Sequence, residues 1–185
     1  MYSNRYSAVG QISLVLAACA AAASTPLGSP APDFTIADQY DHPVRLSSLR
    51  GKPVLVIYGD RVGSSFMGAW ARAVKTETAA AGVDVIEAAN LKTVPGFMHA
   101  YVKHKFLGKN AKGDPASPVL LDWDGRIAST YGFHDGLTNV YVIDAQGTFR
   151  FWAAGKGTAE ETRPLAEVLQ ALNSPADTNG GPRQR

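Results

Sequence analysis

Cysteine is nearly absent from this chain: its 185 residues include a single one, Cys19. A single cysteine excludes an intramolecular disulfide bond, so the sequence carries no disulfide signature of an oxidising compartment. Cys19 also precedes the region that we predict to fold, which therefore contains no thiol. A folded region without a thiol cannot perform thiol chemistry with its own side chains.

Excess charge of one sign is missing too, and histidines are few. The chain has 18 basic and 16 acidic residues, and the formal net charge of +2 gives no reason to expect a nucleic-acid partner. His99 and His104 do not share a helix face, and no cysteine or glutamate completes a set of metal ligands. No histidine stands near Ser64 or Ser65 to activate a hydroxyl. We therefore predict no metal, no cofactor and no catalytic residue.

The apolar run near the N-terminus, residues 8–18, is too short to cross a bilayer. It follows Arg5 and runs into small residues, which is typical of an export signal, here over residues 1–23. The sequence Leu-Ala-Ala-Cys at 16–19 resembles the bacterial lipobox, in which the cysteine becomes the lipidated first residue of the mature protein. This resemblance implies that Cys19 is a membrane anchor. An ordinary cleaved signal, which would discard Cys19, and an uncleaved cytosolic chain are the alternatives.

Three segments follow the export signal. Residues 24–32 are rich in proline and glycine, which favours a tether over a helix or a central strand. Residues 33–173 carry the apolar patterns of one domain, and with 45% hydrophobic residues the chain is long enough to bury a core. Residues 174–185 are polar and rich in glycine and proline, so we predict a disordered tail.

The run Val-Leu-Val-Ile-Tyr at 54–58 predicts the central strand of the domain, because it is apolar and rich in β-branched residues. Further strands are predicted at 83–88, 118–122, 139–144 and 148–152, and a hairpin at 33–46. Helices are predicted at about 66–81, 93–106 and 158–172. Tyr101, in the second helix, is expected to lie in the core. Asp122 and Asp124 are explained by a turn that ends at Gly125.

Two stretches resemble a known family: Pro-Ala-Pro-Asp-Phe at 30–34 and Val-Arg-Leu-Ser-Ser-Leu-Arg-Gly-Lys-Pro-Val-Leu-Val at 44–56. They are similar to the start of the domain in the redoxin branch of the thioredoxin-like superfamily, which contains peroxiredoxins and periplasmic thiol-disulfide oxidoreductases. The resemblance extends over residues 30–172. It implies an α/β fold, a thioredoxin-like three-layer sandwich with a central mixed β-sheet, helices on both faces and an N-terminal β-hairpin.

The chain departs from these relatives at two places in the expected active site. The relatives carry a reactive cysteine, or a Cys-x-x-Cys pair, in the loop after the central strand, whereas positions 63–66 here are Gly, Ser, Ser and Phe. They also usually place a cis-proline before the third core strand, where this chain has Thr138. A cis bond before a non-proline residue costs about 2.5–4 kcal/mol, so we predict a trans bond there. The resemblance therefore identifies a divergent member that lacks the active-site cysteines.

The polar residues nearest to this altered loop form the candidate binding site. Asp60, Arg61, Ser64 and Ser65 lie in the loop, and the resemblance places Thr138 opposite them. Arg61 beside the N-terminus of the following helix would bind an anion, because a guanidinium and free backbone N–H groups converge there. The alternative is a local Asp60–Arg61 arrangement in which Ser64 or Ser65 only caps the helix.

Together these observations predict an exported, lipid-anchored protein of the periplasm or cell envelope that binds a partner protein, a peptide or a small anion. Dithiol chemistry is not expected of it. Secretion without an anchor is the alternative location. One alternative function is that of the family, a thiol-disulfide oxidoreductase or peroxidase that depends on thiols supplied by a partner; another is a structural role in the envelope.

Overall fold

The computed structural model describes residues 25–110 and 118–173. The predicted export signal with Cys19 and the predicted disordered tail at 174–185 lie outside the described residues. Within the described ranges, no helix is long and apolar enough to span a membrane.

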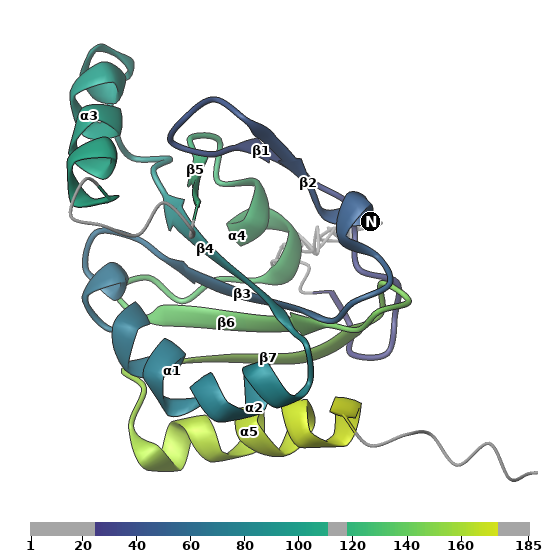
Figure 1. Ribbon diagram of the computed structural model, residues 1–185. Helices are drawn as coiled ribbons and strands as arrows, with labels where there is room; N and C mark the ends of the chain where they lie inside the picture. The colour runs from purple at the N-terminus through teal and green to yellow at the C-terminus, as the bar shows by residue number, and fades with distance from the viewer. Residues whose placement is uncertain (1–24, 111–117, 174–185) are drawn as a thin grey trace, which may run out of the picture.

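A five-stranded sheet with the strand order β5-β4-β3-β6-β7 forms the centre of the domain (Figure 1). Its strands are β3 (Val54–Gly59), β4 (Asp84–Asn90), β5 (Val119–Asp122), β6 (Thr138–Ile143) and β7 (Phe149–Gly155). β4 pairs in parallel with β3 and β5, whereas β6 pairs antiparallel with β3 and β7. The sheet is therefore mixed, as predicted.

β3 lies in the middle of the sheet, and both of its faces are apolar. All six of its residues are buried. Val54, Val56 and Tyr58 belong to one hydrophobic cluster, and Leu55 and Ile57 belong to another. Successive side chains of a strand point to opposite faces, so the two clusters lie on the two sides of the sheet. The predicted central strand is confirmed.

Three helices cover one face of the sheet: α1 (Met67–Ala73), α2 (Lys75–Ala80) and α5 (Ala159–Asn173) (Figure 1). Trp70 of α1 is fully buried there, and its Nε1 donates a hydrogen bond of 3.1 Å to the carbonyl oxygen of Gly155. α1 and α2 replace the single helix predicted at 66–81. The chain leaves the helical conformation at Val74 (φ −114°, ψ 15°), whose side chain is buried in the core.

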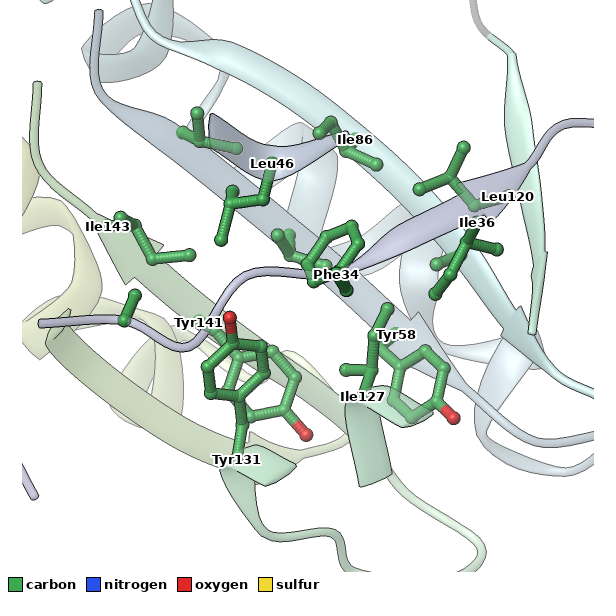
Figure 2. Close-up of a cluster of buried hydrophobic side chains, with 14 of the residues drawn as sticks. Phe34, Ile36, Leu46, Tyr58, Ile86, Leu120, Ile127, Tyr131, Tyr141 and Ile143 are labelled. Atoms are coloured by element: carbon green, nitrogen blue, oxygen red, sulfur yellow. The ribbon is translucent and has the colours of Figure 1, made fainter. Parts of the chain in front are cut away.

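The N-terminal hairpin and a short helix cover the opposite face. The hairpin consists of β1 (Thr35–Ala37) and β2 (Pro43–Arg45), which pair antiparallel, and the helix is α4 (Arg126–Tyr131). Figure 2 shows how Phe34 and Leu46 from the hairpin side meet Ile127 and Tyr131 of α4 over the sheet. Helices, sheet, and hairpin with α4 form three layers, which confirms the predicted sandwich and its N-terminal hairpin.

The sequence pattern did not predict α4. Its six residues carry two large apolar side chains, Ile127 and Tyr131, which are too few to indicate a helix by periodicity. The helix starts because the carboxylate of Asp122 accepts hydrogen bonds from the backbone N–H groups of Arg126 (2.9 Å) and Ile127 (3.0 Å). A buried side chain from the end of β5 thus defines where α4 begins.

Part of the predicted tether packs against the domain. Gly28 N–H donates a hydrogen bond to the carbonyl oxygen of Phe149 (2.7 Å), and Phe149 N–H donates one to that of Ser29 (2.9 Å). Ala31 N–H donates to the carbonyl oxygen of Gly147 (2.8 Å), and Ala31 belongs to the core cluster. Prolines interrupt this segment, but the residues between them keep their N–H groups. The folded domain therefore begins before the predicted boundary at residue 33.

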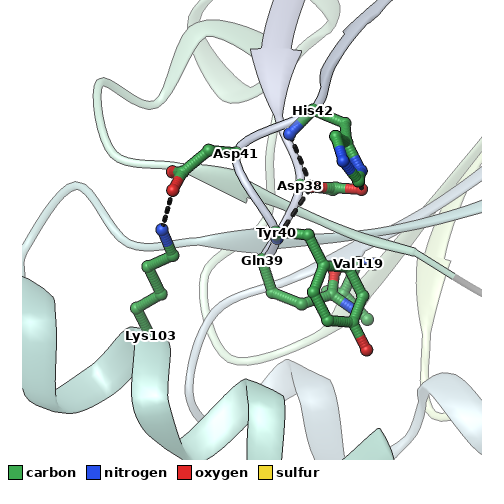
Figure 3. Close-up of polar contacts among 7 residues, drawn as sticks. All are labelled: Asp38, Gln39, Tyr40, Asp41, His42, Lys103 and Val119. Carbon is green, nitrogen blue, oxygen red and sulfur yellow. Dashed lines mark hydrogen bonds and ion pairs between the residues drawn. The ribbon is translucent and has the colours of Figure 1, made fainter.

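A 3-10 turn, η3 (Gly96–Met98), leads into α3 (His99–Asn110), which stands beyond the carboxyl end of β4 (Figure 1). The turn of the N-terminal hairpin contacts this helix (Figure 3). Asp41 forms an ion pair with Lys103 of α3, and the side chain of Gln39 accepts a hydrogen bond of 2.8 Å from Val119 N–H in β5. Asp38 holds the turn by accepting backbone hydrogen bonds within it. The hairpin turn therefore contacts both α3, through Asp41, and β5, through Gln39.

We expect the protein to lose stability as the pH falls from about 4 to about 2. Burial raises the pKa of Asp33, but hydrogen bonds from Arg45 and Ser47 outweigh this and lower it from 3.8 to about 2. A carboxyl whose pKa is lower in the folded than in the unfolded state contributes stability above the unfolded pKa. This contribution is lost as the pH falls through the folded pKa. Asp144, whose pKa is also lowered through Thr148 and Arg150 against the effect of burial, acts in the same direction.

Thermal unfolding of the wild type and of Asp33→Asn at pH 5, 4, 3 and 2 tests this expectation. The variant has no carboxyl at position 33 to protonate, so its melting temperature falls less steeply between pH 4 and 2. An equally steep fall in both proteins would contradict the assignment to Asp33.

Candidate functional site

The carboxylate of Asp60 joins the loop after β3 to the loop before β6. One of its oxygens accepts hydrogen bonds from the backbone N–H groups of Val62 (3.0 Å) and Gly63 (2.7 Å). The other accepts one from Gly136 N–H (2.8 Å). Hydrogen bonds to an ionised acceptor are stronger than neutral ones, so this half-buried residue fixes the distance between two loops that are far apart in sequence.

Gly63 lies directly against the backbone that precedes Thr138. A Cβ atom built on Gly63 would lie 2.1 Å from the carbonyl oxygen of Leu137 and 2.6 Å from its carbon. The Thr138 hydroxyl donates a hydrogen bond of 2.7 Å to the carbonyl oxygen of Gly63, and Thr138 is fully buried. The described residues contain no cis peptide bond, so the bond before Thr138 is trans, as predicted. Position 63 has no room for any side chain, and therefore none for a cysteine.

The two serines of the loop do not cap the following helix. Ser64 Oγ donates to the carbonyl oxygen of Arg61 (3.0 Å), and Ser65 Oγ donates to that of Val62 (2.5 Å). The N-terminal cap residue of α1, Phe66, has no side-chain hydrogen bond. The predicted serine cap is therefore wrong. Both hydroxyls donate to carbonyl oxygens three residues earlier in the chain, so they stabilise the 3-10 turn η2 (Gly63–Ser65) that precedes α1.

A cavity of about 540 Å³ opens beside this loop, between the carboxyl ends of β3 and β4 and helix α3. Its volume lies in the range of about 300–1,000 Å³ that is usual for small-ligand sites. Its polar lining is contributed by Asp60, Arg61, Ser64, Asn90 and Thr93. Its apolar wall is contributed by Leu91, Val94, Met98, Tyr101, Val102 and Phe106. Three of the predicted site residues thus meet a wall that comes from a distant part of the chain.

The predicted residues differ in what they can offer a ligand. Asp60, Arg61 and Ser64 line the cavity. Ser65 is exposed but is not part of the lining, and Thr138 is buried, so its place in the structure is to hold Gly63. Among the ion pairs formed by the described residues, none involves Arg61, whose side chain is exposed. Its guanidinium is therefore available to an anion.

The sequence prediction missed the α3 wall of the cavity. Tyr101, expected in the core, lines the cavity and is 58% exposed; Phe97 in the preceding turn η3, which is not part of the lining, is 87% exposed. Large aromatic residues with this much exposed surface mark a contact surface more often than a core. The signal was present in the apolar spacing of Val94, Met98 and Val102, but the sequence could not indicate that this face meets the loop after β3.

Several other polar or aromatic groups that could take part in chemistry already have partners in the structure. Asp122 accepts a hydrogen bond of 2.8 Å from the Tyr58 hydroxyl, and burial together with the Asp122 charge raises the pKa of Tyr58. The ring of His99 stacks on Trp123 with centroids 4.0 Å apart, and that of His134 stacks on Trp152 at 5.3 Å. Within ranges 25–110 and 118–173, no three His, Cys, Asp or Glu side chains are placed to hold a metal ion.

Residues 27–151, more than half of the chain, match the model of the AhpC/TSA family. The chain belongs to the AhpC/TSA family. This confirms the redoxin resemblance over most of the domain, and the missing cysteines mark the protein as a divergent AhpC/TSA member. No curated protein sequence is similar enough to this AhpC/TSA chain to match it.

Solved structures resemble this AhpC/TSA protein in fold. One, described as a protein disulfide isomerase from Bacteroides thetaiotaomicron, has a TM-score of 0.59 and 23% identity, covering 80% of this chain and 89% of its own. Another, described as the thiol:disulfide interchange protein DsbE from Chlorobium tepidum, has a TM-score of 0.60 and 20% identity, with 82% and 100% covered. The exposed lipoprotein thioredoxin Etrx1 from Streptococcus pneumoniae has a TM-score of 0.55 and 20% identity, with 74% and 99% covered. At these identities the likeness establishes a thioredoxin-like fold and not an activity.

Proposed function

We propose that this AhpC/TSA protein has no dithiol chemistry and acts as a binding module, which takes a partner protein, a peptide or a small anion at the surface around Asp60 and Arg61, where the cavity opens. The observation that carries this proposal is the contact between Gly63 and Leu137. A Cβ atom at position 63 would overlap a backbone carbonyl, so the loop is closed where relatives carry a reactive thiol. The same loop lines a cavity of about 540 Å³, which supports binding in place of redox turnover.

The remaining side chains of the site support the proposal because none is set up as a nucleophile. The described residues contain no cysteine. The hydroxyls of Ser64 and Ser65 donate to backbone oxygens, and none of their hydrogen bonds involves a histidine. A hydroxyl becomes a nucleophile only with a base in reach, so acyl transfer by these serines is not proposed.

We place the protein at the cell envelope, held by a lipid on Cys19. The lipobox-like sequence at 16–19 supports the anchor. One structure with this fold is an exposed lipoprotein thioredoxin, which supports the same location for a domain of this kind. A segment from residue 20 to about 27 would then separate the domain from the lipid.

Assays of insulin disulfide reduction and hydrogen peroxide consumption, with dithiothreitol as the electron source, test the loss of redox chemistry. We expect wild type and Cys19→Ala to turn over no faster than the buffer, while a dithiol thioredoxin serves as the positive control. Turnover by Cys19→Ala would overturn the proposal, because that chain has no thiol. Turnover by the wild type alone would assign a thiol function to Cys19 in place of an anchor.

Family membership supports a second candidate, assistance to a thiol-disulfide oxidoreductase or peroxidase whose thiols come from a partner protein. In that case the chain would stimulate the turnover of a purified thiol enzyme while remaining inactive by itself. Absence of any effect on such an enzyme favours binding of a separate ligand.

A further inference from the structure

The cavity beside the loop has one cationic corner and one apolar wall. Arg61 is exposed at the edge formed by the loop, and the wall opposite is made by Val94, Met98, Tyr101 and Val102. A pocket with a broad apolar surface and a few polar groups at one end selects a ligand that is itself divided into an apolar body and a polar end.

The charges around the cavity favour an anion at the polar end. Asp60 is the acidic residue of the lining, and its carboxylate oxygens already accept three backbone hydrogen bonds. Arg61 has no ion pair with any described residue. A second cation, Lys105, is not part of the lining, but its Nζ lies 5.2 Å from the centroid of the Tyr101 ring. A guanidinium presents paired N–H donors that match a carboxylate.

The apolar wall of the cavity includes large hydrophobic side chains that are exposed to solvent. Within the wall, Tyr101 is 58% exposed and Met98 36%. Phe97, which precedes Met98 in η3 but does not line the cavity, is 87% exposed. Covering such side chains removes apolar surface from water, which is the main favourable contribution to binding an alkyl chain.

We infer that the cavity binds a single-chain amphiphilic anion, with its carboxylate on the Arg61 guanidinium and its alkyl chain along the α3 wall. This inference rests on the proposed binding function and specifies its ligand class. The carboxylate and chain are the chemistry of a free fatty acid. A protein segment would need an extended surface, whereas the carboxyl end of β4 and the base of α3 enclose a volume the size of one small molecule.

Calorimetric titration of the full-length protein with dodecanoate, below the concentration at which it forms micelles, tests this inference. We expect one dodecanoate per chain. Acetate, which has the head without the chain, and dodecanol, which has the chain without the charge, bind at least about tenfold more weakly, because each loses one of the two contributions.

Two variants locate the bound molecule. Arg61→Gln removes the charge and keeps a side chain of similar length, and it weakens dodecanoate binding at least about tenfold while leaving dodecanol unchanged. Tyr101→Ser changes an exposed wall residue and weakens both ligands. Arg163→Gln, at an exposed arginine on α5 that does not line the cavity, is the matched control and leaves both affinities unchanged.

The outcomes separate the ligand class from the proposed function. Dodecanoate affinity that is the same in the wild type and Arg61→Gln overturns the inference, as does the absence of binding. If a short acidic peptide of alternating glutamate and valine binds in an Arg61-dependent manner and dodecanoate does not, the ligand class is wrong and the binding function stands. Turnover by the cysteine-free variant overturns the binding function itself.

Discussion

Replacing Gly63 by alanine is expected to lower the free energy of unfolding by about 3 kcal/mol or more. The new Cβ atom would lie 2.1 Å from the carbonyl oxygen of Leu137. Overpacking of a well-packed site costs about 1–3 kcal/mol when side chains can shift, and more is expected here because both partners are backbone. Separating them would also strain the hydrogen bond from Thr138 and those to Asp60.

Urea unfolding monitored by circular dichroism measures this effect. Gly96→Ala is the matched control, because Gly96 also lies in a 3-10 turn and a Cβ atom there would meet nothing within 4 Å. We expect this control to stay within about 0.5 kcal/mol of the wild type. A Gly63→Ala protein as stable as the control would mean that the loop separates from Leu137 at little cost, and the proposed closure of the site would fail.

The same contact predicts the result of restoring a thiol. Gly63→Cys is expected to be at least as destabilised as Gly63→Ala, since its side chain begins with the same Cβ atom. Adding Phe66→Cys to Gly63→Cys creates a Cys-x-x-Cys motif in the sequence. The side chain of Cys at position 63 can be accommodated only if the loop before Thr138 moves away, because its Cβ atom would overlap the Leu137 carbonyl.

Replacing Asp122 by alanine is expected to destabilise the protein by about 3 kcal/mol or more. This carboxylate is 1% exposed and accepts hydrogen bonds from the Tyr58 hydroxyl and the N–H groups of Arg126 and Ile127. Each buried donor left without a partner costs about 1–3 kcal/mol. Loss of this carboxylate also removes the side chain that starts α4, and α4 covers one face of the sheet.

Asp124 provides the control for Asp122. Both aspartates flank Trp123, but the Asp124 side chain is 71% exposed and forms only an ion pair of 3.4 Å with Arg126. Exposed ion pairs contribute about 0–1 kcal/mol, so Asp124→Ala is expected to change stability by less than about 1 kcal/mol. Chemical unfolding of Asp122→Ala and Asp124→Ala, each compared with the wild type, measures the two changes in the free energy of unfolding. Equal effects would mean that the two residues do no more than form a turn.

The sheet and the N-terminal hairpin could be predicted because their signals are local. Five consecutive apolar residues at 54–58 indicate a strand buried on both faces wherever the rest of the chain lies. Helix α4 lacked such a signal, since its start depends on Asp122, which is itself held by Tyr58, 64 residues earlier in the chain. The break between α1 and α2 at Val74 likewise accompanies burial of that side chain in the core.

The candidate site could be predicted on one side only. Asp60, Arg61 and Ser64 were selected from their place after the central strand, and they do line the cavity. The α3 wall of the cavity was not predicted. Tyr101 has the residue type and spacing of a core position, yet it is 58% exposed. Helical periodicity identifies an apolar face but not what that face meets.

The sequence by itself determined that the folded region has no thiol, because covalent composition does not depend on how the chain folds. It also determined the buried central strand, since the required apolar residues are contiguous. Only the tertiary structure decided that Gly63 touches Leu137 and that Arg61 faces the α3 wall. Both contacts join residues that are distant in sequence, and their proximity results from the packing of β3, β6 and α3, which no local pattern records.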